Sequence, residues 1–321
     1  MKTTPLAGGV RDQELTAYAS AVGAYVIWGF LPLYFMLLGA IPADQVVAQR
    51  IIWSVVLVGI AMLAAHRFDE VMEVFRDRKR VMRLTFSAAI LAGNWLIFIL
   101  AVEHSRVLEV SFGYFINPLV SVGLGTILLG ERLSRGQMLA VAIASVAIAI
   151  QAWGLGSFPW ISLALAFTFG IYGFLRKKVV VGAAPGLFVE AAVLLPLALA
   201  YLGWNGLQGT LTFGGDALGA VLVAGTGVVT AVPLILFARG VSFLPLTTIG
   251  ILQYFAPSLH FILAIVVFDE PLDPMRLASF ALIWVSLVVF TRDLLRRRAA
   301  AVAAGKAAAA AAAAAGTGVV K

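Results

Sequence analysis

Long apolar runs follow one another along most of the chain, and each run is ended by charged residues or by Gly/Pro turns. A helix needs about 20 apolar residues to cross the hydrocarbon core of a membrane, and ten runs approach that length. Of the 321 residues, 62% are hydrophobic and 12% are charged, which is more apolar surface than a water-soluble fold can bury. The sequence therefore predicts an all-α integral membrane protein with ten transmembrane helices.

The ten predicted spans begin and end at these turns and charges. In chain order they are Ala17 to Gly39, Gln45 to Ala65, Met82 to Val102, Leu108 to Leu129, Gln137 to Trp153, Trp160 to Leu175, Gly186 to Trp204, Leu218 to Ala238, Leu246 to Phe268, and Met275 to Thr291. The residues before the first span are polar, and no small-residue cleavage site follows that span. This pattern predicts an uncleaved signal anchor with the N-terminus in the cytoplasm.

Lys and Arg residues concentrate in alternate loops, as they do on the cytoplasmic side of membrane proteins. With the N-terminus inside, the inner segments hold Arg67, Arg76, Arg78, Lys79, Arg80, Arg83, Arg132, Arg135, Arg176, Lys177, Lys178, Arg239, Arg292, Arg296, Arg297 and Arg298. The outer loops hold Arg106 and Arg276. We expect a multi-pass protein of the cell (inner) membrane, in contact with membrane lipid and with both termini in the cytoplasm. The same bias explains the net charge of +7 without a nucleic-acid partner.

An internal repeat relates the two halves of the chain. The segment from Tyr114 to Pro118 resembles the segment from Gln253 to Pro257 at an offset of 139 residues, and Glu131 matches Glu270 at the same offset. Each half contains five predicted spans, and because five is odd the second half must be inverted relative to the first. Two inverted five-helix repeats are an architecture of transporters.

This repeat divides the chain into four parts. We predict a cytoplasmic N-terminal segment at residues 1–16, a first five-helix repeat at 17–155 and a second five-helix repeat at 156–293. Residues 294–321 form a basic and then alanine-rich cytoplasmic tail, which either extends the last helix or stays disordered. We assign no function to this tail.

Pro118 and Pro257 occupy matched positions in the two repeats. A proline inside a span removes one backbone hydrogen bond and frees a carbonyl group, which lipid cannot satisfy. We therefore predict two broken helices that face a protein-lined cavity. The alternative is that both prolines are simple kinks packed against neighbouring helices.

Two ionisable residues, Arg50 and Glu190, fall well inside predicted spans, where a charge is costly unless it is paired or hydrated. Their positions nearly match in the repeat. Arg50 lies below the outer end of its span and Glu190 above the inner end of its own, which places them about 15 Å apart along the membrane normal. A direct ion pair between them is not expected.

We predict instead that each of these residues closes one mouth of a pathway. The outer partner of Arg50 would be Glu103 or Glu109. The inner partners predicted for Glu190 are basic, namely Arg239 or the cluster Arg176, Lys177 and Lys178. Two closures that open one at a time suit alternating access. The alternative is that both charges only fix the packing of the helices.

Aromatic and uncharged polar residues at membrane depth form a candidate substrate cavity. The set is Trp28, Asn94, Trp95, Phe98, Tyr114, Asn117, Tyr172, Gln253, Tyr254 and His260. Aromatic faces with a few hydrogen-bonding groups suit an amphipathic organic solute better than a bare ion. For any one member, a hydrogen bond between helices is the alternative. His260 is also a candidate proton relay, although a single membrane histidine is more often a packed one.

Several short segments together resemble a known family. They are Ala24-Tyr25-Val26-Ile27-Trp28-Gly29, Arg50-Ile51-Ile52-Trp53-Ser54, Gly93-Asn94-Trp95-Leu96-Ile97-Phe98, Gly113-Tyr114-Phe115-Ile116-Asn117-Pro118-Leu119, Gly130-Glu131-Arg132-Leu133 and Leu252-Gln253-Tyr254. They are similar to the RarD subgroup of the EamA-like drug/metabolite transporters. The resemblance implies ten helices in two inverted repeats and a permease linked by name to chloramphenicol sensitivity. It supplies no settled substrate.

The sequence offers little support for catalysis. There is no cysteine, no His-Glu-x-x-His pair and no Gly-x-Ser-x-Gly turn, so we predict no enzyme, no metal and no cofactor. The expected partner is a small-molecule solute moved by alternating access, with a proton or a counter-solute as the driving ligand. A homodimer is compatible with the sequence. An intramembrane enzyme and a non-catalytic membrane scaffold are the alternatives.

Overall fold

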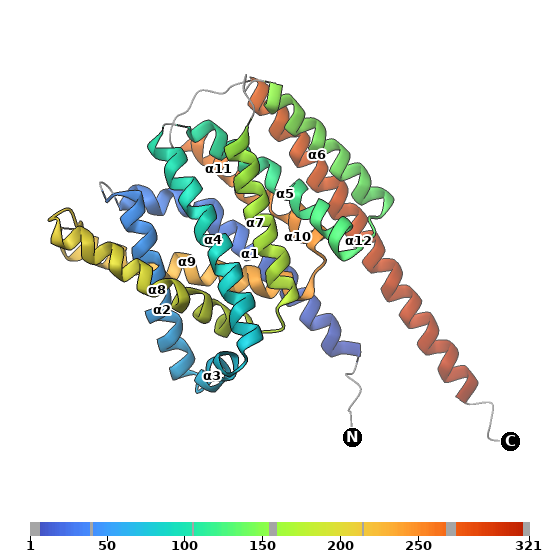
Figure 1. The fold of residues 1–321 in the computed structure, drawn as a ribbon. Coiled ribbons are helices and arrows are strands. Elements are labelled where there is room, and N and C mark those ends of the chain that lie inside the picture. Colours follow the sequence, from blue (N-terminus) through green and yellow to red (C-terminus); the bar gives the residue numbers. More distant parts are fainter. Residues whose placement is uncertain are drawn as a thin grey trace.

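The computed structural model describes residues 7–38, 41–104, 106–153, 159–213, 215–267 and 274–316, and no strand occurs among them. The described residues form helices that pack into one bundle (Figure 1). The helices are α1 (Ala7–Leu37), α2 (Ala43–Ala64), α3 (Phe68–Arg76), α4 (Arg78–Glu103), α5 (Val107–Leu129), α6 (Arg135–Trp153), α7 (Trp160–Lys178), α8 (Ala183–Leu207), α9 (Ala217–Phe243), α10 (Leu246–Leu252), α11 (Phe255–Val266) and α12 (Pro274–Gly316). An all-α membrane fold is therefore confirmed.

Nine stretches of the described residues are long and apolar enough to cross a membrane. They lie in α1, α2, α4, α5, α6, α8, α9, the combined α10–α11 segment and α12. The remaining predicted span is the helix α7, whose last turn contains Arg176, Lys177 and Lys178 and is therefore less apolar. The predicted boundary between the halves, at residues 155 and 156, lies outside the described residues, as does Glu270.

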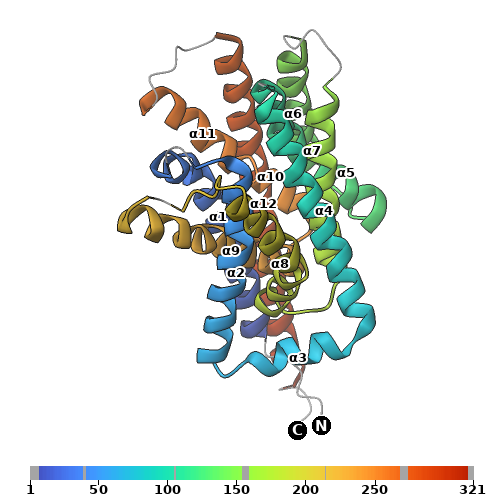
Figure 2. The same ribbon diagram turned by 60° about the vertical axis from the view of Figure 1, so that its left-hand side comes forward.

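Two helices extend beyond the predicted spans. The first helix already begins at Ala7, inside the segment predicted to be a polar N-terminal arm. The last helix, α12, continues to Gly316 and so includes much of the alanine-rich tail. Figure 2 shows that the start of α1, the end of α12 and the short helix α3 all lie at the same end of the bundle.

The helix α3 was not predicted, because residues 66–81 were assigned to an inner loop. It is amphipathic: Val71 and Val74 are buried, while the side chains of Met72 and Phe75 are 43% and 42% exposed. A helix with apolar residues on one face and charged residues on the other suits the boundary between lipid and water. The helix therefore connects α2 to α4 along one end of the bundle.

The two matched prolines behave differently. The helix α5 runs without interruption through Pro118, so the prediction of a broken helix there is wrong. At this point α10 packs closely on α5, because a Cβ added at Gly250 would lie 2.7 Å from the Pro118 carbonyl oxygen. The second predicted break is present, between α10 and α11, just before Pro257. Pro257 has no N–H to donate to the carbonyl of Gln253, which accepts instead from the N–H of Ala256 at 3.2 Å.

Close contact between α2 and α9 depends on a small residue. A Cβ added at Gly227 would lie 2.6 Å from the backbone carbonyl of Trp53, and backbone atoms cannot move aside cheaply. We expect Gly227→Ala to lower stability by about 1–3 kcal/mol, since overpacking of this size forces the helices apart.

Thermal unfolding of the purified protein in detergent measures this effect. The matched control is Gly93→Ala, because a Cβ at Gly93 meets no atom within 4 Å and alanine is the better helix former. Equal melting temperatures for the two variants would contradict the close α2–α9 contact.

Candidate functional site

A buried ion pair joins α7 to α8 in the interior of the bundle. The Arg176 Nη1 atom lies 3.6 Å from Glu190 Oε1, and both side chains are 2% exposed. The hydroxyl of Ser87 on α4 donates to the same carboxylate, and the Tyr172 hydroxyl lies 3.4 Å from Glu190 Oε2. Gly186 makes room for the pair, since a Cβ there would overlap the guanidinium. Arg176 is thus one of the inner partners that the sequence predicted for Glu190.

Arg50 of α2 has no carboxylate partner among the described side chains. Its Nε–H donates to Thr230 Oγ1 of α9 at 2.7 Å. The central guanidinium carbon lies 5.2 Å from the centre of the Trp95 ring and 5.7 Å from that of Phe35, within the range of cation–π attraction. Four helices therefore surround the Arg50 side chain: its own helix α2, and α1, α4 and α9.

The predicted pairing of Arg50 with Glu109 is wrong in this structure. Glu109 lies in the first turn of α5 and pairs with Arg106 at 2.6 Å, because the two are three residues apart at the start of that helix. The side chain of Glu103, the other predicted partner, lies outside the described residues. Arg239 is exposed on α9 and is not the described partner of Glu190.

A small cavity of about 20 Å³ is lined by both Arg50 and Glu190, between α2, α4, α8 and α9. Ser54, Trp95 and Thr230 also line it. This volume holds about one water molecule and is far below the several hundred Å³ of a typical organic ligand site. The conformation is therefore closed around these two residues.

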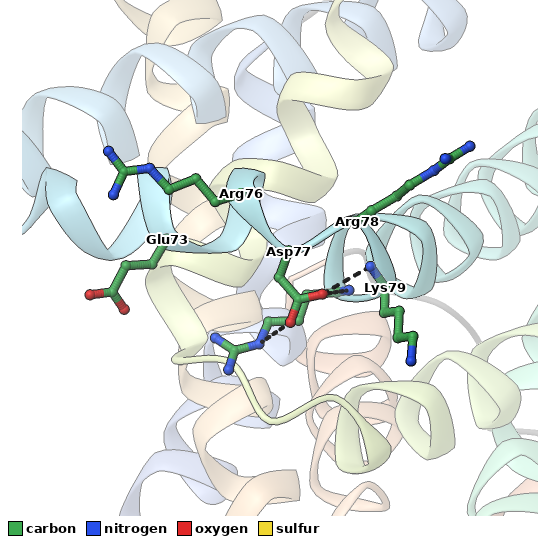
Figure 3. Close-up of a pocket in the computed structure, with 6 residues that line it drawn as sticks. Glu73, Arg76, Asp77, Arg78 and Lys79 are labelled. Carbon is green, nitrogen blue, oxygen red and sulfur yellow. Dashed lines mark hydrogen bonds and ion pairs between the residues drawn. The ribbon is translucent and has the colours of Figure 1, made fainter.

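A larger hollow of about 580 Å³ lies at the surface, where α3 meets α4. It is lined by charged side chains, and Figure 3 shows Arg76 and Arg78 pointing away from each other. Asp77 accepts from the backbone N–H groups of Arg80 and Lys79 at 3.2 and 2.9 Å, and these hydrogen bonds lower the pKa of its carboxyl group. This open corner is polar and water-facing rather than a solute site.

An aromatic cluster lies beside the ion pair. The Trp28 ring lies 5.7 Å from that of Phe237 and 5.8 Å from that of Phe169, and Tyr172 stacks on Phe237 at 6.0 Å. Trp28 also accepts a hydrogen bond at its carbonyl from His260 Nε2, at 3.0 Å, if that nitrogen carries the proton. Two of the predicted cavity residues, Trp28 and Tyr172, therefore belong to one packed group.

The remaining predicted cavity residues are distributed over the bundle. Asn94 donates to the Leu165 carbonyl at 3.0 Å and to Thr168 Oγ1 at 2.8 Å, which is a hydrogen bond between α4 and α7. Phe98 packs against a small apolar cluster between α4, α5 and α7. The Tyr114 ring lies 6.5 Å from that of His260 and its side chain is 42% exposed. The ten residues therefore do not form a single site.

Three polar residues near the crossing of α5 and α10 remain unsatisfied. Asn117 Oδ1, Gln253 Oε1 and the Tyr254 hydroxyl are buried and have no hydrogen-bond partner among the described residues. Such groups are costly in a native fold and often mark a place where another conformation or a ligand supplies the partner. Asn117, Gln253 and Tyr254 therefore stay candidate residues of the substrate cavity.

Sequence reasoning missed several residues that complete the site. Thr230 and Ser87 are the hydroxyl partners of Arg50 and Glu190, and Phe35 is the second aromatic ring beside Arg50. A polar side chain inside an apolar run was the available signal for Thr230 and Ser87. Phe35 gave none, because phenylalanine is common in every span.

Comparison with known proteins decides the family. No family model matches, but a "Protein RarD" of Streptomyces exfoliatus is 42% identical over 89% of this chain and 91% of its own length. The chain belongs to the RarD family. An uncharacterized transporter of Pseudomonas aeruginosa is 45% identical over 86% of this chain and 93% of its own, and a RarD relative from the same organism, 32% identical, is named as chloramphenicol-sensitive.

The RarD fold is also shared with a solved crystal structure. That protein is 21% identical in sequence, covers 90% of this chain and 98% of its own, and superimposes with a TM-score of 0.67. At this identity the likeness concerns the arrangement of the helices.

The buried ion pair makes a direct prediction about stability. Glu190→Gln leaves the Arg176 guanidinium uncompensated, and we expect a loss of about 3–5 kcal/mol, because a lone buried charge is costly. Arg176→Met should cost a similar amount. The double variant removes both charges and should recover most of the loss. A double-mutant cycle by chemical unfolding in detergent measures the coupling, and strictly additive losses would contradict the pair.

Proposed function

We propose that this chain is a membrane transporter that moves a small organic solute by alternating access. The proposal is supported by its RarD relatives, several of which are named transporters. The observation that carries it is the closed cavity in the bundle interior, because Arg50 and Glu190 both line it from different helices. Ionisable groups facing one internal cavity at membrane depth are a feature of solute and ion pathways.

We further propose ten spans in two inverted repeats, with α7 as the sixth span. The proposed correspondence matches α1 with α7, α2 with α8, α4 with α9, α5 with α10–α11, and α6 with α12. Helix packing supports it: the α1–α9 contact has its counterpart in α7–α4, α2–α9 in α8–α4, and α5–α7 in α11–α1. The contacts α2–α8, α5–α10 and α6–α12 would then lie across the pseudo-two-fold axis.

The Glu190–Arg176 pair is proposed to be the inner closure of this transporter. The pair itself lies within the second proposed repeat, whereas the Ser87 hydrogen bond to Glu190 joins that repeat to α4 of the first, so rocking of one repeat against the other would separate Ser87 from Glu190. A proton or a counter-solute that competes for the Glu190 carboxylate would provide energy coupling. A homodimer remains part of the proposal without a described interface.

Orientation in the cell (inner) membrane can be tested directly because the chain contains no cysteine. We propose that both termini are cytoplasmic. Lys79→Cys lies at the end that holds α3, and the exposed Gln208→Cys lies at the opposite end, after α8. A membrane-impermeant maleimide should label Gln208→Cys in intact cells and Lys79→Cys only after permeabilisation. Labelling of both variants from outside, or the reverse pattern, would contradict the orientation.

Transport itself is tested in proteoliposomes. We expect saturable uptake of at least one labelled amphipathic solute from a panel that includes chloramphenicol, and faster entry when the vesicles are preloaded with the unlabelled solute. Preloading accelerates a carrier because its loaded form returns the site to the outer face, whereas a channel shows no such effect. Protein-free liposomes are the control. Absence of saturable flux with correctly folded protein would favour a scaffold or an enzyme.

A further inference from the structure

The guanidinium of Arg50 carries a charge that the protein leaves unbalanced. Arginine has five N–H donors and stays protonated in proteins. One of them, Nε–H, is used by the neutral hydroxyl of Thr230, and no described carboxylate pairs with the side chain. The two terminal amino groups therefore have no protein acceptor among the described residues. The side chain is half-buried, and a charge at this depth of a membrane span requires a partner or water.

The two carboxylates that could balance Arg50 each already pair with another arginine. Glu190 lines the same cavity but pairs with Arg176, and Glu109 pairs with Arg106. The cavity lining thus holds one guanidinium, that of Arg50, and one carboxylate, that of Glu190, whose charge is balanced by Arg176 from outside the lining. One positive charge remains, which a single anionic group would balance.

The surroundings of Arg50 also indicate the shape of such a ligand. The Trp95 and Phe35 rings lie 5.2 and 5.7 Å from the guanidinium carbon, and such contacts leave its terminal N–H donors free. A guanidinium fork held this way matches the two oxygens of a carboxylate, while aromatic faces suit an apolar ring beside that carboxylate.

We propose that Arg50 is the anion-binding residue of the transport site, and that the solute of this RarD protein is an amphipathic organic acid carrying a carboxylate. The assignment rests on the proposed transport function and adds the class of its substrate. It replaces the outer latch predicted from sequence. Thr230 is a positioning residue, because its hydroxyl holds Nε and leaves the terminal amino groups directed to the ligand.

The test uses full-length protein and two matched sets of solutes that differ only in the charged group. The sets are indole-3-acetate, indole-3-acetamide and tryptamine, and phenylacetate, phenylacetamide and phenethylamine. Titration calorimetry in detergent should show each carboxylate binding about 30-fold more tightly than its amide, the usual value of a charge-assisted hydrogen bond. Equal binding of acid and amide, or no binding of either acid, overturns the proposal.

Substitutions then locate the preference. Arg50→Gln should remove it, and Arg50→Lys should keep part of it, since lysine retains the charge but lacks the planar fork. Arg135→Gln is the matched control, because it removes one positive charge from an exposed position at the start of α6 and should bind as the parent protein does. If Arg50→Gln does not fold, the acid-to-amide ratio of the parent protein still decides. A preference that survives in folded Arg50→Gln overturns the assignment.

Failure of this inference can be told apart from failure of the transport proposal. Saturable flux of chloramphenicol or an amine that is unchanged in Arg50→Gln would leave transport standing and remove the anion site. Carboxylate binding that depends on Arg50, with no flux of any solute in the panel, would support the anion site and contradict the transport proposal.

Discussion

The hydrocarbon core of a membrane contains no water to solvate a charge, and this constraint determines how the centre of the bundle is built. The Glu190 carboxylate of α8 receives donors from α4 and α7, through Ser87 and Arg176. Arg50 of α2 is held by Thr230 of α9 and by aromatic rings of α1 and α4. These contacts thus connect six helices, and two of them, Ser87 with Glu190 and Arg50 with Thr230, join the first half of the sequence to the second.

Charge also closes the end of the bundle where α9 turns into α10. Glu131 accepts from the N–H groups of Leu246 and Thr247 at 2.7 and 2.8 Å, so a carboxylate caps the positive N-terminus of α10. Lys177 donates to the carbonyl groups of Val241 and Leu244, at the negative C-terminus of α9. Together with the Glu190–Arg176 pair, these contacts join α5, α7, α8, α9 and α10.

Much of the fold was readable from the sequence, because span length is dictated by membrane thickness and nine of the predicted spans recur as long apolar helices. The amphipathic helix α3 was missed although Phe68, Val71 and Phe75 follow a helical period. Partners were harder to predict. Glu109 pairs with the nearby Arg106 rather than with Arg50, and Asn94 forms a hydrogen bond between two helices. A sequence indicates the depth of a residue in the membrane but not the direction in which its side chain points.

The central claim is that the closed cavity between Arg50 and Glu190 opens to one side at a time. Spin-label distances test it most directly, with an inner pair at Lys79→Cys and Val180→Cys and an outer pair at Leu37→Cys and Leu207→Cys, all of them at exposed positions. These distances are measured in lipid with and without a transported solute. The account predicts two populations whose inner and outer distances change in opposite directions. Distances that stay fixed, or that lengthen together, while the solute is transported would contradict it.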